Sequence, residues 1–194
     1  MKATFFERLV SYILDYIIVG IIFLFIFTGV EEVPSPTKKL MAELDTKLME
    51  NSITMEEYAN EYPKLLYDYQ KETILTTGIS IALTIAYYAV FQYMNNGQTI
   101  GKRILRIRVV DKNTQQPVSI LKGSIRTILI YNIFSGVVGI PLLYMLKPHA
   151  YFLVYFFLAA IELTLILISA MFVLYRQDKR GIHDILTDTI VVKE

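Results

Sequence analysis

Residues 9–30 read Leu9-Val-Ser-Tyr-Ile-Leu-Asp15-Tyr-Ile-Ile-Val-Gly-Ile-Ile-Phe-Leu-Phe-Ile-Phe-Thr-Gly-Val30 and form an unbroken apolar run. As a helix, about 22 residues span roughly 33 Å, which is enough to cross a bilayer. One ionisable side chain, Asp15, lies within the run, and Arg8 lies at its edge. A carboxylate inside a membrane segment costs about 2.5–3.5 kcal/mol on insertion scales, so Asp15 must be stabilised by the fold or used by it.

Three more apolar stretches follow in a chain that is 54% hydrophobic. Together with the first run they predict an all-α membrane protein with four transmembrane helices, at residues 9–30, 73–94, 128–146 and 152–175. The third stretch is the least regular, because Asn132, Gly136, Gly139 and Pro141 interrupt it. The first run is too long for the apolar region of a signal peptide, so we expect it to be retained.

Charge is segregated between the segments that join these spans. Residues 31–72 hold ten acidic and five basic residues, whereas residues 95–127 hold seven basic residues and one acidic residue. Basic residues in short loops favour the cytoplasmic side. We therefore expect a multi-pass protein of the cell membrane with the loop 95–127, the tail 176–194 and both termini in the cytoplasm, and with 31–72 as an extracytoplasmic insert.

The insert has the pattern of a helical hairpin. Leu40, Leu44 and Leu48 repeat at helical spacing, and Asn51-Ser52 interrupts the pattern. Thr54 followed by Glu57 is typical of a capping box at the start of a second helix. We predict a pair of helices that covers one end of the bundle.

The basic loop has a different pattern, with basic and apolar residues alternating in Arg103-Ile-Leu-Arg-Ile-Arg-Val-Val110. Alternation favours a short strand, and residues 187–192 of the tail are the expected partner, which gives a small cytoplasmic β-hairpin-like element. The loop's charge also favours contact with anionic lipid. Nucleic-acid binding is not expected, because no folded basic domain surrounds the patch.

Four polar residues in or beside the spans are candidates for a ligand or ion pathway. Arg8 and Asp15 are seven residues apart and share one helical face. Asn132 is expected near the depth of Asp15, which makes it a candidate partner. Glu162 is expected about 9 Å from that depth, too far for the two acids to share a proton. A purely structural role for both carboxylates stays open, because either one could orient the bundle by bonding to a neighbouring helix.

Several kinds of chemistry have no support in the sequence. The chain has no cysteine, which excludes disulfides and thiolate chemistry. His183 and Asp184 are adjacent, so their side chains diverge and do not predict a metal site or a hydrolase triad. We expect no metal, no cofactor, no catalytic residue and hence no enzyme.

Three segments together resemble the RDD family of bacterial membrane proteins, which is named for one arginine and two aspartates. They are Phe6-Glu-Arg8-Leu-Val-Ser-Tyr-Ile-Leu-Asp15, Gly97-Gln-Thr99-Ile-Gly101-Lys102 with its continuation to Asp111, and Arg180-Gly181-Ile-His183-Asp184 with its continuation to Thr189. The resemblance assigns the second aspartate to Asp184, with Asp111 as the alternative. The segment 31–72 lies outside the shared pattern.

The resemblance implies transport of ligands that are not identified, with cation/proton antiport proposed for some members. The leading hypothesis is a small transporter or ion translocator that uses Asp15. A homo-oligomer is expected, since four short spans leave little interior for a pathway. The competing hypothesis is a non-transporting accessory or regulatory subunit that binds another membrane protein.

Overall fold

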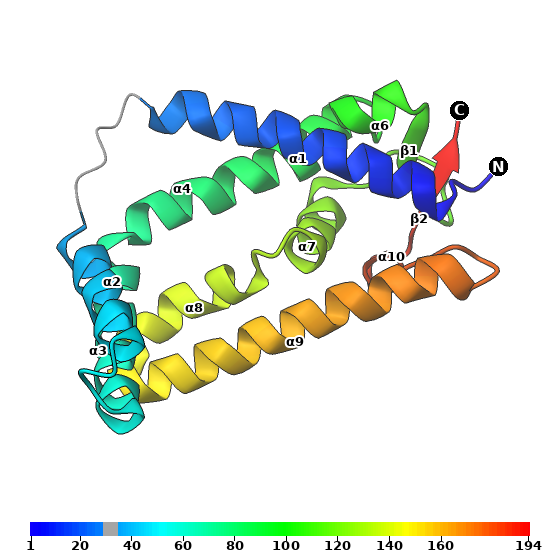
Figure 1. Cartoon of the computed structure of the whole chain (residues 1–194). Coiled ribbons are helices and arrows are strands. Elements are labelled where there is room, and N and C mark those ends of the chain that lie inside the picture. Colours follow the sequence, from blue (N-terminus) through cyan, green and yellow to red (C-terminus); the bar gives the residue numbers. More distant parts are fainter. Residues whose placement is uncertain (29–34) are drawn as a thin grey trace.

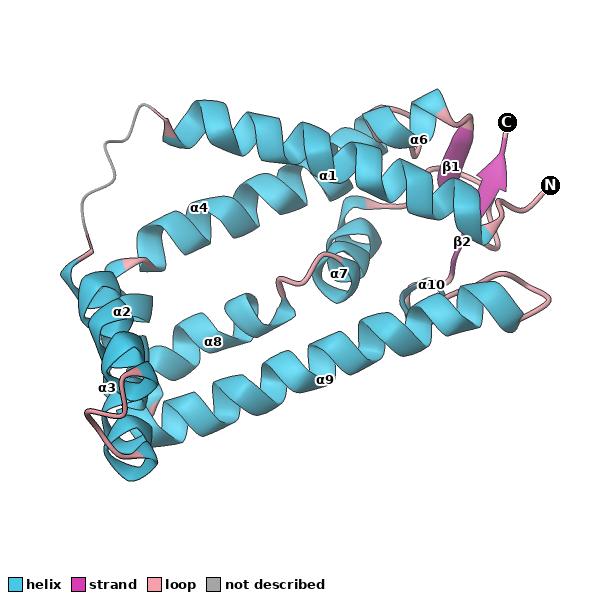
Figure 2. Cartoon of the chain, viewed as in Figure 1, coloured by secondary structure: helices cyan, strands magenta, loops and turns pink. Residues whose placement is uncertain are grey.

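The computed structural model describes residues 1–28 and 35–194. In these ranges the chain is mostly helical, with one small sheet (Figures 1 and 2). The elements are α1 (Phe5–Phe27), α2 (Pro36–Met49), α3 (Met55–Glu72), α4 (Ile74–Ile85), the π-helical turn η1 (Ala86–Phe91), α5 (Gln92–Met94), α6 (Ile100–Ile104), β1 (Ile107–Asp111), α7 (Ile120–Ile130), α8 (Phe134–Met145), α9 (Pro148–Tyr175), α10 (Ile182–Leu186) and β2 (Thr189–Lys193). Both termini lie with the sheet at one end of the helices, the sheet end, and α2 and α3 lie at the opposite end, the hairpin end (Figure 1).

Three helices are long and apolar enough to cross a membrane: α1, the helix Ile74–Met94 that combines α4, η1 and α5, and α9. By length and apolar composition they correspond to the predicted spans 9–30, 73–94 and 152–175 to within a few residues. Helix α1 begins earlier than predicted, because Thr4 and Glu7 form a capping box before the apolar run. The predicted end of this span at residue 30 and the first four residues of the insert, 31–34, lie outside the described residues.

The predicted third span, 128–146, is wrong as a single helix. Helices α7 and α8 meet there at an angle of 87°, so they form a broken span if they cross together. The break falls at Asn132, which has a φ of 55° and cannot continue a right-handed helix. The other residues that interrupt this stretch, Gly136, Gly139 and Pro141, all lie inside α8. Gly139 is instead a contact point, since a Cβ there would lie 3.1 Å from the ring of Tyr155.

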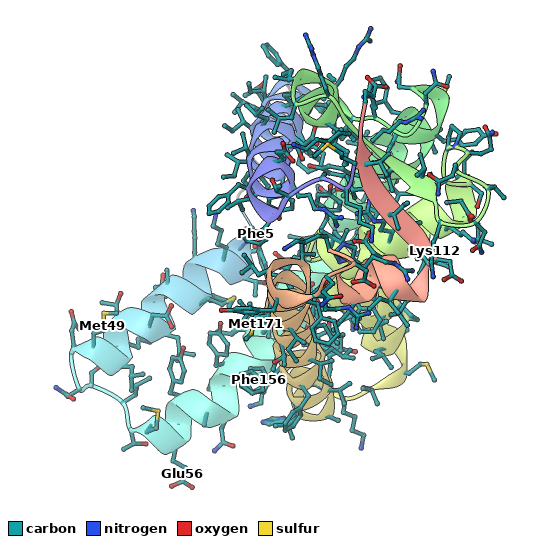
Figure 3. All side chains as sticks on the ribbon, turned by 90° about the vertical axis from the view of Figure 1, so that its right-hand side faces the viewer. Phe5, Met49, Glu56, Lys112, Phe156 and Met171 are labelled. Carbon is teal, nitrogen blue, oxygen red and sulfur yellow. The ribbon has the colours of Figure 1, made fainter. Side chains whose placement is uncertain are left out.

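The predicted helical hairpin is present in α2 and α3. Ser35 caps α2, and Thr54 forms the predicted capping box with Glu57. Tyr58 donates a hydrogen bond to Asp45 across the pair at 2.8 Å. The hairpin tip, marked by Met49 and Glu56, projects away from the bundle (Figure 3).

The sheet joins the basic loop to the tail. Strands β1 and β2 pair antiparallel with Val109 opposite Val191, which confirms the predicted pairing. The partners are far apart in sequence, so the element is a two-stranded sheet and not a local hairpin. Its buried side is a small apolar core of Ala3, Ile107, Val109, Val118 and Val191. Because Ala3 belongs to this core, the start of the chain is fixed beside the sheet immediately before α1.

Candidate functional site

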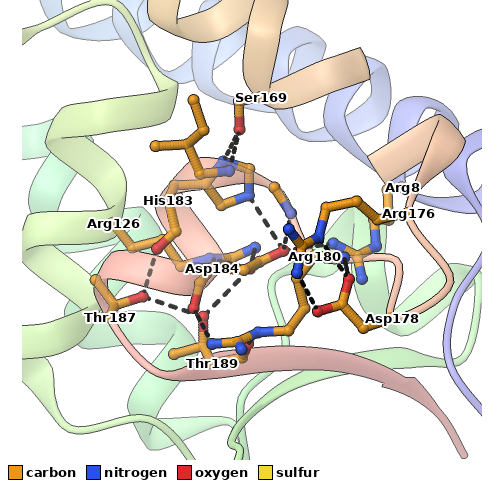
Figure 4. A network of polar contacts seen from close by, with 12 residues as sticks. Arg8, Arg126, Ser169, Arg176, Asp178, Arg180, His183, Asp184, Thr187 and Thr189 are labelled. Carbon is orange, nitrogen blue, oxygen red and sulfur yellow. Dashed lines mark hydrogen bonds and ion pairs between the residues drawn. The ribbon is translucent and has the colours of Figure 1, made fainter. Parts of the chain in front are cut away.

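A buried ionic network at the sheet end is centred on Asp184, in α10 (Figure 4). Its carboxylate is fully buried and accepts hydrogen bonds from Arg8 at 2.7 Å and from Nε of Arg126 at 3.1 Å. Burial acts to raise the pKa of Asp184, but Arg126, His183 and Arg8 outweigh it and hold that pKa well below its ordinary value. The network therefore connects the tail to α1 and α7.

Two further contacts fix α10 itself. Arg180 donates to the carbonyl oxygen of Asp184 at 2.8 Å and to that of Thr189 at 3.0 Å. The Ser169 hydroxyl lies 2.7 Å from Nδ1 of His183 and accepts the backbone N–H of Ile182 at 3.0 Å. These bonds hold the short helix between α9 and β2.

A hydrolase triad needs a chain of contacts from Ser to His to Asp, and such a chain runs through Ser169, His183 and Asp184. Nε2 of His183 is 3.4 Å from Asp184. That carboxylate already has two arginine partners, and burial lowers the pKa of His183. A weakly basic imidazole next to a neutralised carboxylate is a poor activator of a serine. The contacts favour a structural connection between α9 and α10.

Asp15 forms a second closed site, one that ties the basic loop to α1. Its carboxylate is fully buried and accepts hydrogen bonds from Tyr87 at 2.7 Å, Thr99 at 2.5 Å and the backbone N–H of Gly101 at 2.8 Å. A Cβ on Gly101 would lie 2.5 Å from the carbonyl oxygen of Ser11 and 2.9 Å from the Asp15 carboxyl carbon. Only glycine allows α6 to approach α1 this closely.

Lys102 lies next to this site. Its ammonium is 4.0 Å from Asp15 and donates to Gln92 at 2.8 Å and to Thr99 at 3.3 Å. Burial lowers the pKa of Lys102 to about 7, although Asp15 partly opposes the shift. Asp15 is therefore associated with the basic loop through Thr99, Gly101 and Lys102.

Two other family-motif residues shape the loop. Gly97 has a φ of 85°, and a Cβ there would lie 2.2 Å from the Val109 carbonyl oxygen, so this turn requires glycine. Asp111 accepts a hydrogen bond from Lys122 at 2.6 Å, and this bond together with the turn N–H groups lowers its pKa to about 2. Asp111 therefore stabilises the turn after β1. The two buried arginines, Arg8 and Arg126, pair with Asp184 and not with Asp111.

Glu162 and Asn132 both lie at the break between α7 and α8. The buried Glu162 carboxylate accepts the backbone N–H groups of Phe134 at 2.7 Å and Ser135 at 3.1 Å, the first residues of α8. A carboxylate is favoured there because these N–H groups have no partner within the helix. Asn132 forms the turn before α8, and the described hydrogen bonds do not connect it to Asp15 as expected. The two buried acids have different partners.

Two cavities adjoin the break on opposite sides. The larger, of about 600 Å³, is lined by residues of α1, α3, α4, α8 and α9, and reaches from Tyr69 to Asn132. The smaller, of about 260 Å³, lies among α1, α7 and α9 at the sheet end. Tyr12 and Tyr131 line both cavities and stack with a centroid distance of 5.4 Å. Tyr88 stacks on Tyr131 at 3.5 Å.

The tyrosine stack was not predicted from the sequence. Its members come from three different helices, so no spacing along the chain connects them. A weak signal was present, because tyrosine is enriched at membrane interfaces and Tyr12, Tyr88 and Tyr131 share the end of the spans that adjoins the basic loop. Arg126 was counted only as a loop charge, although it is the second partner of Asp184.

Within residues 1–28 and 35–194, no group of three or more His, Cys, Asp or Glu side chains is placed to hold a metal ion. No curated protein and no solved structure matches the chain. The model of the RDD family matches residues 2–188, a range that includes the Arg8–Asp184 pair, Asp15 with its glycine-bounded loop, and the break between α7 and α8. The chain therefore belongs to the RDD family.

Proposed function

We propose that this membrane protein transports a small solute that occupies the larger cavity. The observation that carries the proposal is a space of about 600 Å³ that ends at a broken span. Ligand pockets commonly have volumes of about 300–1,000 Å³. Broken helices near the middle of a membrane recur at the substrate sites of transporters.

The lining of this cavity favours an uncharged polar solute. Threonine and serine hydroxyls of α4 line one side, among them Thr77, Ser80 and Thr84, and aromatic rings line much of the rest. The described lining residues include no Asp, Glu, Lys, Arg or His. A charged solute there would lose its hydration without gaining a counter-charge, whereas a neutral solute needs only hydrogen bonds and apolar contact.

The tyrosine stack forms the barrier in this proposal. A solute in the larger cavity meets Tyr12, Tyr88 and Tyr131 before the smaller cavity. The break beside Tyr131 lacks the backbone hydrogen bonds of a continuous helix, which lets the residues at the break move while Arg126 keeps α7 at the ionic network. Movement of Tyr131 away from Tyr12 would connect the two cavities.

Arg8 and Asp15 act as positioning residues in this proposal. Each is held by protein partners, and Asp15 does not line either cavity. The proton- or cation-coupled form of the hypothesis then rests on Lys102, which lines the smaller cavity 4.0 Å from Asp15. Uptake or release of a proton by Lys102 would change the charge beside Asp15. This change would strengthen or weaken the contact between α1 and the basic loop.

The test is flux into liposomes that contain the purified full chain. Glycerol and erythritol entry is measured by stopped-flow light scattering, and Na⁺- or K⁺-driven proton movement is measured with an enclosed pH dye. Thr77→Leu fills the larger cavity, and Thr164→Leu is the matched control, since Thr164 is an exposed threonine of α9 outside the lining. Polyol entry above that of empty liposomes, reduced by Thr77→Leu alone, supports the proposal.

Two results would count against it. Polyol entry equal to that of empty liposomes contradicts the neutral solute, and cation-driven proton movement that Lys102→Gln abolishes would favour the ion-coupled form. Absence of both fluxes, with a stoichiometric membrane protein co-purifying, would favour the accessory role. The hairpin supplies a surface for such a partner, because Met49 and Met55 are 83% and 67% exposed near its projecting tip.

We also propose that the sheet end faces the cytoplasm. The basic loop, the tail and both termini gather there, as the charge pattern requires (Figure 1). Single cysteines in place of Asn51 and Lys112 test the orientation, since the natural chain has none. A membrane-impermeant thiol reagent should label Asn51→Cys in intact cells and Lys112→Cys only after lysis; labelling of both in intact cells contradicts this orientation.

A further inference from the structure

The smaller cavity combines an apolar surface with a cationic one. Along one side it is apolar, with Leu9 of α1 and Ile166 and Ala170 of α9 among its lining residues. Arg8, Lys102 and Arg126 line it as well. The described lining residues include no carboxylate. A ligand complementary to both surfaces has an anionic head and an apolar chain.

The charges around the cavity leave a positive excess while Lys102 holds its proton. Three cationic side chains line it. Their carboxylate partners, Asp15 and Asp184, are not among the lining residues. Among the described residues, Nε of Arg8 is buried and has no hydrogen-bond acceptor. An N–H of a charged group is unfavourable without an acceptor, so the Arg8 guanidinium is not fully satisfied by its bond to Asp184.

The position of the cavity favours a ligand that comes from the bilayer. Leu9 is 39% exposed, so the cavity's apolar side reaches the surface of a helix that spans the membrane. Arg8 is near the start of that helix, where lipid headgroups lie beside a transmembrane span. A lipid can therefore place its head against the three cations while its chain stays along α1 and α9.

We infer that the smaller cavity binds an acidic lipid, with its oxyanion head against Arg8, Lys102 and Arg126 and the first part of an acyl chain between α1 and α9. The inference rests on the smaller cavity alone, and in the transport proposal the lipid would occupy the space that lies beyond the tyrosine stack. It would hold α1, α7 and α9 together at the sheet end, where the ionic network is also centred.

Native mass spectrometry of the purified full chain tests the inference. The protein is exchanged into micelles that hold equal amounts of phosphatidylglycerol and phosphatidylcholine, and the retained lipid is counted. One phosphatidylglycerol per chain is expected, in preference to phosphatidylcholine. Ala170→Leu fills the apolar side without changing a charge and should lower the retention about tenfold, which corresponds to about 1.4 kcal/mol. Ala160→Leu, an exposed alanine of the same helix outside the cavity, should retain lipid as the natural chain does.

Two lysine substitutions and a second acidic lipid complete the experiment. Lys102→Gln should weaken phosphatidylglycerol retention. Lys122 is a lysine of α7 that does not line the cavity, so Lys122→Gln should leave the retention unchanged. Oleate added to phosphatidylcholine micelles distinguishes a free fatty acid from a phospholipid, and retention of either acidic lipid in an Ala170-dependent manner supports the site. Equal retention of both phospholipids, or unchanged retention by Ala170→Leu, would overturn it.

Discussion

At the sheet end, Asp15 and Asp184 are fully buried, and each accepts hydrogen bonds from several other segments of the chain. Around the larger cavity, the hydroxyls of Thr76 and Thr84 bond to carbonyl oxygens of their own helix and line open space. The first arrangement connects elements that are distant in sequence, and the second consists of hydrogen bonds within one helix. The residues that name the family thus connect elements at the sheet end, while the larger cavity extends toward the hairpin end.

The largest expected effect comes from removing the centre of the ionic network. Asp184→Ala leaves Arg8 and Arg126 as buried charges without their shared partner, which should lower the free energy of unfolding by about 3–5 kcal/mol. Thermal unfolding of the purified protein in detergent, followed by circular dichroism, measures the change.

Asp188→Ala is the matched control for this comparison. Asp188 has a 59% exposed side chain 3.5 Å from Arg180, so loss of the pair should cost at most about 1 kcal/mol, and alanine at its φ of 50° adds about 1 kcal/mol of backbone strain. Equal effects of the two substitutions would show that the ionic network does not stabilise the sheet end more than a surface pair does.

Only part of this difference between the two regions could be predicted from the sequence. The spans follow from the length of their apolar runs, and the capping boxes at Thr4 and Thr54 and the strand pairing depend on short patterns, so each can be recognised locally. The partner of Arg8 lies 176 residues away, and the chain between them sets that pairing through helix packing. The break at Asn132 has no proline or glycine next to it, and it depends on Glu162 from another helix to satisfy the new helix start.

A smaller effect should follow from changing the closest backbone contact at the sheet end. Gly101→Ala places a methyl group 2.5 Å from the Ser11 carbonyl oxygen, so α6 must move away from α1 and weaken the bonds to Asp15. Overpacking of this kind costs about 1–3 kcal/mol. The same unfolding measurement applies.

Gly78→Ala sharpens the comparison, because Gly78 lies in α4 and a Cβ there would meet nothing within 4 Å. Alanine is favoured over glycine inside a helix by about 0.5–1 kcal/mol, so this variant should be unchanged or slightly more stable. If Gly101→Ala were also neutral, the close approach of the loop to α1 would not be required for stability.

Per pH unit, the smallest expected effect is a pH dependence of stability that originates at Lys102. The pKa of Lys102 is about 7 in the folded protein, against an ordinary value of 10.5, because burial of its ammonium outweighs the opposing attraction of Asp15. Between these two pH values the unfolded chain holds a proton that the folded chain has lost, so the free energy of unfolding should rise with pH. Below pH 7 both states hold the proton, and the contribution of Lys102 is constant at its lowest value. The slope for one proton is at most about 1.4 kcal/mol per pH unit.

Unfolding temperatures measured from pH 6 to pH 9 should therefore rise more steeply for the natural chain than for Lys102→Gln, which has no ammonium to lose. Lys122→Gln should keep the slope of the natural chain, since Lys122 is a partly exposed lysine paired with Asp111. His183 also titrates, with a lowered pKa, but it is present in all three proteins and cancels in the comparison. Parallel curves for the natural chain and Lys102→Gln would mean that the ammonium keeps its proton, so the pair with Asp15 would be a fixed ionic contact and the proton-coupled form of transport would lose its carrier.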